Sequence, residues 1–311
     1  MAGGQERILR RRIRSVNATK KITRAMELIA ASRIVKAQAR VHAAVPYANG
    51  ITDVVRNLQA AGGGQGHPML VEREEIRRVA QVVITADRGL AGAYNSSVIR
   101  ATEAELREHA ALGRDYALIT VGRKAEGYFR FRDYRIDAAH TGFSENPSYE
   151  DARAVAGSVL GRYEAGELDL VQLIYTRFVT AGRQEIVVSN LLPLADEDIT
   201  GAAVEGEGPV SDYEFEPSPD AILDALAPRY AEARVYAALL NAAASEHAAR
   251  QRAMKAATDN AEELIKSLTR VMNRARQDSI TSEIMEIVGG AEALKSDKKH
   301  HDHDELVETS V

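Results

Sequence analysis

A turn with the composition of a phosphate-binding loop follows the first apolar strand that the sequence predicts. It runs Asp87-Arg88-Gly89-Leu90-Ala91-Gly92 and stands between that strand and a helix. Backbone N–H groups at a helix N-terminus are a common phosphate site in α/β proteins. The turn matches neither the Walker pattern nor GxGxxG, and Gly122-Arg123-Lys124 gives the same result. We therefore interpret both as plain βα turns and predict no bound cofactor.

Residues for nucleophilic or metal chemistry are sparse. The chain has no cysteine, which excludes disulfides, thiolate metal sites and cysteine nucleophiles. Neither GxSxG nor a helical His-Glu-x-x-His occurs. The run His300-His301-Asp302-His303-Asp304 offers metal ligands, but a flexible tail gives them no fixed coordination geometry. The sequence thus predicts no catalytic residue and no metal site.

A polar cluster near the end of the last predicted helix is the remaining candidate site. It spans about three helical turns. Two interpretations stay open from the residues alone, a docking surface for another protein and a helix face that is polar for solubility. Its members are Arg274, Arg276, Gln277, Asp278, Ser279, Thr281 and Glu283.

The composition describes a soluble, folded protein. Of its 311 residues, 45% are hydrophobic and 27% charged, with no Trp and 5% aromatic residues. So few bulky residues suit close-packed helices better than a large globular core. No run of about 18 apolar residues is present to span a membrane, and the N-terminus lacks the apolar core of a secretory signal. We predict a soluble protein of a reducing or redox-neutral compartment.

Positive charge is concentrated at the N-terminus, although the formal net charge of the chain is −5. Between Met1 and Val45 the only acidic residues are Glu6 and Glu27. Basic blocks of this kind face nucleic acid, anionic membranes or acidic proteins. A solvated helix face is the alternative.

The first 60 residues are predicted to form one long helix. Neither Gly nor Pro occurs from Gln5 to Val45, and the pattern resumes after Pro46, which is expected to bend the helix rather than end it. The glycines of 62–66 then end it. The predicted apolar stripe comprises Ile8, Ile13, Val16, Ile22, Met26 and Ile29.

Residues 220–294 are predicted to form a second long helix. No Gly or Pro occurs from Arg229 to Val288, and an alanine-rich heptad seam runs along that stretch. A helix so long needs another long helix against which to bury its seam, and the N-terminal helix is the only candidate in the chain. We therefore expect an antiparallel coiled coil of the two ends. The seam comprises Leu226, Tyr230, Ala233, Ala237, Leu240, Ala244, His247, Gln251, Met254, Thr258, Ala261, Ile265, Leu268, Met272 and Ala275.

The middle of the chain, 76–200, is predicted to be an inserted small Rossmann-like α/β domain. Strands are expected at 79–85, 116–121 and 170–175, with 184–188 returning as a hairpin, and helices at 97–111, from 124, and at 149–163. This alternation predicts a small, mostly parallel sheet with helices on both faces. An acidic connection at 201–219 and a disordered charged tail at 295–311 complete the expected organisation.

Three segments of the chain resemble the gamma-subunit family of rotary proton-translocating ATP synthases. They read KITRAMELIAAS at 21–32, TADRGLAGAYN at 85–95, and AMKAATDNA at 253–261 together with ITSEIMEIVGGA at 280–291. The resemblance covers nearly the whole chain up to about Leu294. It departs from the family in the tail beyond Lys295, and the absence of cysteine excludes the thiol switch of the chloroplast members.

The resemblance implies a rotor shaft that couples proton flow to ATP synthesis and has no catalytic site of its own. The implied partners are three alpha and three beta subunits, the epsilon subunit and the c-ring, with no nucleic acid. The implied location is the cytoplasmic face of the bacterial plasma membrane, as a peripheral protein. The resemblance also implies that the following residues contact the beta subunits: Met26, Arg250, Arg276, Gln277, Thr281 and Glu283.

Two other classes stay open from the residues themselves. Basic Arg10-Arg11-Arg12 and the heptads also suit a coiled-coil adaptor or a nucleic-acid-binding arm, for which salt-sensitive DNA binding would be the signature. A small nucleotide-dependent enzyme is the third class, and calorimetry with ATP and NAD would detect it.

Overall fold

The computed structural model describes residues 2–64, 67–194 and 216–307. Two compact units are present, one formed by 1–25 with 255–311 and the other by 26–254. Helices α1 (Ala2–Ala60) and α5 (Pro219–Val307) contribute residues to both units, and every strand lies in the second.

Both long helices pass through a proline. α1 contains Pro46 and α5 contains Pro228. Proline removes one backbone hydrogen bond and bends a helix, but flanking residues that pack well can carry the helix onward. α1 ends just before Gly62, which has a φ of +86°, a conformation that glycine adopts without steric penalty. The expected continuation past Pro46 and the expected break at the glycines are therefore both observed.

The carboxy-terminal stretch differs from the predicted disordered tail. α5 continues through Gly289 and Gly290 as far as Val307, while 308–311 lie outside the described residues. Each glycine inside a helix costs only about 1 kcal/mol relative to alanine, and no proline follows Pro228 within the helix. Most of the predicted connection at 201–219 also lies outside the described residues.

In the first unit, the start of α1 packs against α5 through polar as well as apolar groups. The hydroxyl oxygens of Thr23 and Thr258 are 2.8 Å apart and both side chains are buried. Lys20 Nζ lies 3.0 Å from Glu262 Oε2. On α5, the predicted seam is observed from Thr258 onward, because the following members are buried or half-buried: Thr258, Ala261, Ile265, Leu268, Met272 and Ala275.

The predicted apolar stripe of α1 is wrong at three positions. Ile8, Ile22 and Ile29 are 68%, 61% and 53% exposed. The buried positions recur at the coiled-coil spacing of three and four residues, but small and polar side chains occupy several of them, so hydrophobicity alone misassigned these three positions. The buried or half-buried positions at this spacing are Ile13, Val16, Lys20, Thr23, Glu27, Ala30, Ile34 and Ala37.

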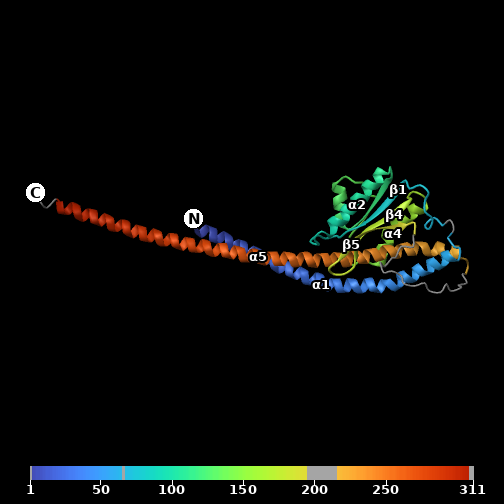
Figure 1. Ribbon diagram of the computed structural model, residues 1–311, viewed down its shortest axis with the longest axis horizontal. Helices are drawn as coiled ribbons and strands as arrows, with labels where there is room; N and C mark the ends of the chain where they lie inside the picture. Colours follow the sequence, from blue (N-terminus) through green and yellow to red (C-terminus); the bar gives the residue numbers. More distant parts are fainter. Residues whose placement is uncertain (1, 65–66, 195–215, 308–311) are drawn as a thin grey trace. The chain divides into compact units, whose positions relative to one another are not determined.

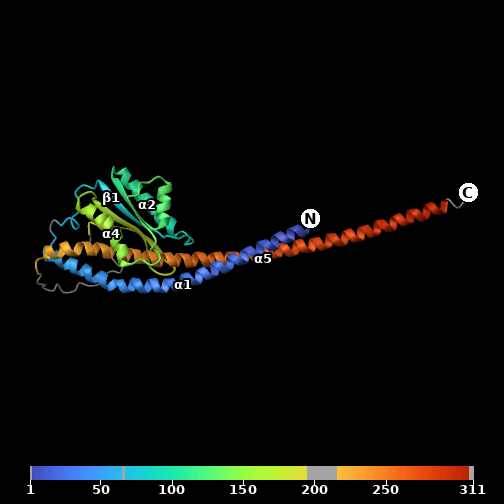
Figure 2. The same ribbon diagram turned by 180° about the vertical axis from the view of Figure 1, so that it is seen from behind.

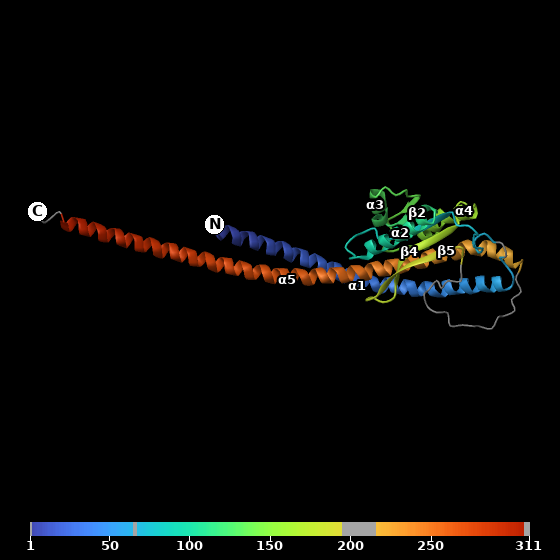
Figure 3. The same ribbon diagram turned by 45° about the horizontal axis from the view of Figure 1, so that its top comes forward.

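The second unit contains a five-stranded mixed sheet in the order β3-β2-β1-β4-β5 (Figure 1). β1 (Arg78–Ile84) pairs in parallel with β2 (Asp115–Val121) and β4 (Leu170–Phe178), and β2 pairs in parallel with β3 (Ala138–His140). β5 (Gln184–Leu192) is antiparallel to β4, and the two lie side by side in Figure 3. The predicted strands and hairpin are thus observed, whereas three-residue β3 was missed.

Helices cover both faces of this sheet. α2 (Tyr94–Ala111) and α3 (Arg123–Phe131) pack on one face, where Val83, Leu118 and Ile174 meet Val98 and Phe129. α4 (Tyr149–Glu164) packs on the other face together with parts of α1 and α5, as Figure 2 shows for α4. The core on this second face includes alanine-rich α5, so this side of the sheet shares one hydrophobic core with α1, α4 and α5.

Candidate functional site

The nucleotide position of a doubly wound sheet is filled by helix α5. In such sheets, ligands bind beyond the carboxyl ends of the strands where the strand order reverses, which here is between β1 and β4. Ser245 Oγ donates to the carbonyl oxygen of Thr176 at 3.1 Å, and Tyr94 Oη donates to that of Ala242 at 3.2 Å. Ala249 packs beside the buried ring of Tyr94. The sheet therefore carries the helix at the place where related sheets carry a ligand.

Asp87 occupies the backbone donors that a phosphate would need. Its carboxylate accepts hydrogen bonds from the N–H groups of Arg123 at 3.2 Å, Gly142 at 2.9 Å and Ser144 at 3.1 Å. Partial burial raises the pKa of Asp87, but these backbone hydrogen bonds outweigh burial, so the pKa lies below its ordinary value. The carboxylate stays charged and takes the anion position at the start of α3.

Gly122 brings the second turn directly against the first. Its φ is +92°, and a Cβ at this position would lie 2.3 Å from the carbonyl oxygen of Thr85. The Thr85 hydroxyl accepts from Ala125 N at 2.9 Å, and Lys124 N donates to the carbonyl oxygen of Ala86 at 3.1 Å. With the N-terminal donors of α3 bonded inside the chain, the two turns act as a structural joint between β1 and β2.

Met26 and Arg250, two of the predicted contact residues, line one pocket in the second unit. Its volume is about 260 Å³, and Arg33, Arg88 and Glu145 also line it. Met26 is half-buried. The pocket thus joins an apolar side chain from α1 with charged side chains from α1, α5 and the turn after β1.

Arg250 is buried and bonded within the chain. Its side chain is 7% exposed and donates to Glu246 Oε1 at 2.6 Å, while its Nη1 lies 3.5 Å from Glu145 Oε1. Burial raises the pKa of Glu246 above its ordinary value, although Arg250 opposes the shift. Arg250 therefore supports the wall of the pocket and offers little surface to another protein.

The other predicted contact residues lie together on α5 in the first unit. Arg276, Gln277, Thr281 and Glu283 are all exposed. The Thr281 hydroxyl donates to the carbonyl oxygen of Gln277 at 3.0 Å, a local bond that leaves the helix surface available.

Apolar residues of the same stretch were missed by the sequence reasoning. They are exposed although they recur at helical spacing, which is the signal that could have identified them. Large exposed apolar groups of this kind mark surfaces that meet other proteins. They are Ile280, Ile284, Met285, Ile287 and Val288.

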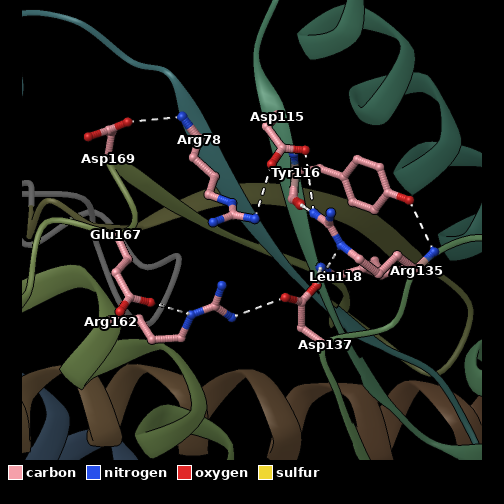
Figure 4. Close-up of polar contacts among 9 residues, drawn as sticks. All are labelled: Arg78, Asp115, Tyr116, Leu118, Arg135, Asp137, Arg162, Glu167 and Asp169. Atoms are coloured by element: carbon pink, nitrogen blue, oxygen red, sulfur yellow. Dashed lines mark hydrogen bonds and ion pairs between the residues drawn. The ribbon is translucent and has the colours of Figure 1, made fainter.

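A chain of ion pairs holds the opposite, amino-terminal edge of the sheet (Figure 4). Arg78 at the start of β1 reaches Asp115 Oδ2 at the start of β2, 3.0 Å away. Arg135 contacts Asp115 and Asp137, and Arg162 on α4 lies 3.3 Å from Asp137. Opposite charges alternate along this edge, so each group has an oppositely charged partner. The arrangement ties the strand ends together and is structural.

In the part of the chain that the structure describes, no group of three or more His, Asp or Glu side chains is placed to hold a metal ion. The side chains of 300–304 lie outside that part. Within the same residues, no helix has the length and apolarity needed to cross a bilayer.

Comparison with known proteins places the chain in a family. A family model described as ATP synthase matches residues 5–294, and the chain belongs to this family. Within it, the similar curated proteins are gamma chains. The ATP synthase gamma chain of Frankia casuarinae is 54% identical over 94% of this chain and 99% of its own length. That of Kineococcus radiotolerans is 51% identical over 94% and 98%.

Solved structures agree with this placement. A chain of the central stalk/c-ring structure of the Tetrahymena thermophila mitochondrial ATP synthase has a TM-score of 0.56 and 26% identity, and the match covers 76% of this chain and 99% of that one. A chain of the OSCP/F1/c-ring structure of the Euglena gracilis mitochondrial enzyme has a TM-score of 0.65, with coverage of 96% and 97%. At 20% identity, the second likeness concerns the fold.

Proposed function

We propose that this gamma chain is the rotor shaft that couples proton flow through a membrane ring to ATP synthesis in a catalytic head. The observation that carries the proposal is in the first unit. There α1 and α5 pack along a seam that includes Thr23 and Thr258, and residues 280–292 of α5 are exposed on all sides. A segment in which two helices pair, followed by a helical segment whose polar and apolar side chains are exposed, suits a shaft that other proteins surround.

We further propose that the two helices form an antiparallel coiled coil with an inserted Rossmann-like domain. In the first unit, Lys20 pairs with Glu262 and Thr23 with Thr258. In the second, Arg40 Nη2 lies 3.4 Å from Tyr236 Oη, and Gly64 N donates to Asp220 Oδ1 at 2.8 Å. Residue numbers rise on one helix as they fall on the other. In this proposal, residues 1–60 and 220–294 form the two helices of the coiled coil and residues 76–200 form the inserted domain. Residues 295–311 form a charged extension, into which α5 continues as far as Val307.

We propose that the chain is a non-catalytic subunit. Its α/β sheet carries α5 where a nucleotide would bind, and Asp87 occupies the anion position of the following turn. Its proposed partners are the alpha and beta subunits, the epsilon subunit and the c-ring. The complex would place it on the cytoplasmic face of the bacterial plasma membrane, as a peripheral protein.

The beta subunits are the proposed partners of two surfaces. Met26 lines a pocket rich in arginine, which suits an acidic segment of a beta subunit, with Arg250 supporting it from behind. Arg276, Gln277, Thr281 and Glu283 form the exposed polar surface near the end of α5. A shaft whose sides differ would present a different face to each of three identical beta subunits. Differential contacts stabilise a different conformation in each.

Reconstitution tests this function. Purified alpha and beta subunits, mixed with the chain, are expected to assemble and to hydrolyse ATP much faster than the same subunits without it. Binding to DNA that weakens with salt, in the absence of assembly, would contradict the proposal and favour the adaptor class.

A further inference from the structure

The loop at 141–148, between β3 and α4, joins the sheet to both long helices in the second unit. Glu145 is its central residue, and its side chain is 22% exposed. The carboxylate forms an ion pair with Arg33 on α1, lies 3.5 Å from Arg250 Nη1 on α5, and lies 3.9 Å from Arg88 Nη1 in the turn after β1. One carboxylate therefore meets guanidinium groups from three separate elements.

Other bonds of the same loop reach the same helices. Arg40 on α1 donates to the side-chain oxygen of Asn146 and to the carbonyl oxygen of Pro147. His247 Nε2 on α5 lies 3.2 Å from the carbonyl oxygen of Glu145. Asp87 holds the base of the loop through Gly142 N at 2.9 Å. The loop is thus fixed to the sheet at its base and to α1 and α5 at its tip.

These bonds differ in kind from the packing around them. Alanine-rich faces of α5 bury apolar surface beside the sheet, and such burial is non-directional. Charge-assisted hydrogen bonds have a preferred direction and length. The loop therefore adds directional bonds that resist a sideways load between the sheet domain and the helices, beside those of Ser245 and Tyr94.

We propose that Glu145 is a positioning residue for torque transfer, which locks the α/β domain to both helices. This inference rests on the proposed rotor function, in which load passes between the foot and the shaft. Glu145 acts through Arg33, Arg88 and Arg250. Without its charge, the three guanidinium groups repel one another, and buried Arg250 keeps its bonds to Glu246 and to the carbonyl oxygen of Gly89.

The test uses the complete ATP synthase in membrane vesicles, with the Glu145→Gln variant. We expect roughly threefold fewer protons pumped per ATP hydrolysed against an imposed pH gradient, because a buried charge that loses its partner weakens the joint. The conservative Glu145→Asp variant should restore most of the pumping. Glu167→Gln, which removes the ion pair with Arg162 at the far edge of the sheet, is the matched control and should pump normally.

Two results would overturn the inference. One is a Glu145→Gln complex that pumps as many protons per ATP as wild type at every gradient. The other is equal loss in the Glu167→Gln control. If Glu145→Gln lowers assembly, Arg40→Gln removes the bonds from α1 to Asn146 and Pro147 at a residue that does not line the Met26 pocket, and it must show the same load-dependent loss. Coupled pumping by the wild-type complex tests the rotor function separately, so the two ideas fail independently.

Discussion

Replacing Gly122 by alanine is expected to lower the free energy of unfolding by about 3 kcal/mol, the sum of backbone strain and overpacking. The added Cβ would lie 2.3 Å from the Thr85 carbonyl oxygen and 2.7 Å from its carbonyl carbon, at a φ of +92°. Both atoms belong to the backbone between β1 and the following turn, so neither can rotate away. Urea unfolding of the purified chain, followed by circular dichroism, measures the change.

Gly127→Ala is the control for this prediction. Gly127 lies inside α3, and a Cβ there would meet no atom within 4 Å. Alanine is a better helix former than glycine, so stability should rise by up to about 1 kcal/mol. Equal unfolding midpoints for the two variants would show that the close approach at Gly122 does not hold the joint together.

Met26→Lys is expected to uncouple the complex more than it unfolds the chain. Met26 is half-buried in a pocket that Arg33, Arg88 and Arg250 also line, and we propose that this pocket faces charged groups of a beta subunit. Lysine at position 26 adds a fourth cation to the pocket and changes the free energy of the proposed contact with a beta subunit by ~1 kcal/mol or more. A change of that size alters the ratio of two competing conformations about fivefold. ATP-driven proton pumping, measured beside ATP hydrolysis, should fall by a similar factor.

Met26→Gln separates charge from shape in this experiment. Glutamine has a length similar to that of methionine but no charge, so it should leave most of the pumping intact. Unchanged pumping in the Met26→Lys complex would refute a role for this pocket in coupling, whatever the effect on stability.

The sheet domain could be predicted from sequence because its strands are apolar runs separated by turn residues. Strands buried on both faces, such as 79–84 and 170–174, are continuous apolar runs, and the length of the run predicts the strand. β3 was missed because three residues are too few to show a pattern. The antiparallel hairpin was recognised from its short connection.

The candidate site was harder to predict, since it depends on tertiary contacts. On α1, the buried face carries Thr23 and Glu27 while Ile22 and Ile29 are exposed, so hydrophobicity misassigned these positions. Glu145 stands in a loop with no motif around it, and only the fold brings it to Arg33 and Arg250. The exposed residues near the end of α5 followed from a resemblance of sequence, and their contact with beta subunits remains a proposal.

The central claim is that the two ends of the chain form one shaft, and a disulfide across it is the most direct test. The hydroxyl oxygens of Thr23 and Thr258 are 2.8 Å apart, which suits the short separation of a disulfide, and the chain has no cysteine of its own. Thr23→Cys with Thr258→Cys should cross-link on mild oxidation, and the oxidised complex should still couple ATP hydrolysis to pumping. Ile22→Cys with Thr258→Cys should not cross-link. Failure of the first pair to form a disulfide, or loss of coupling once it forms, would contradict a shaft that turns as one body.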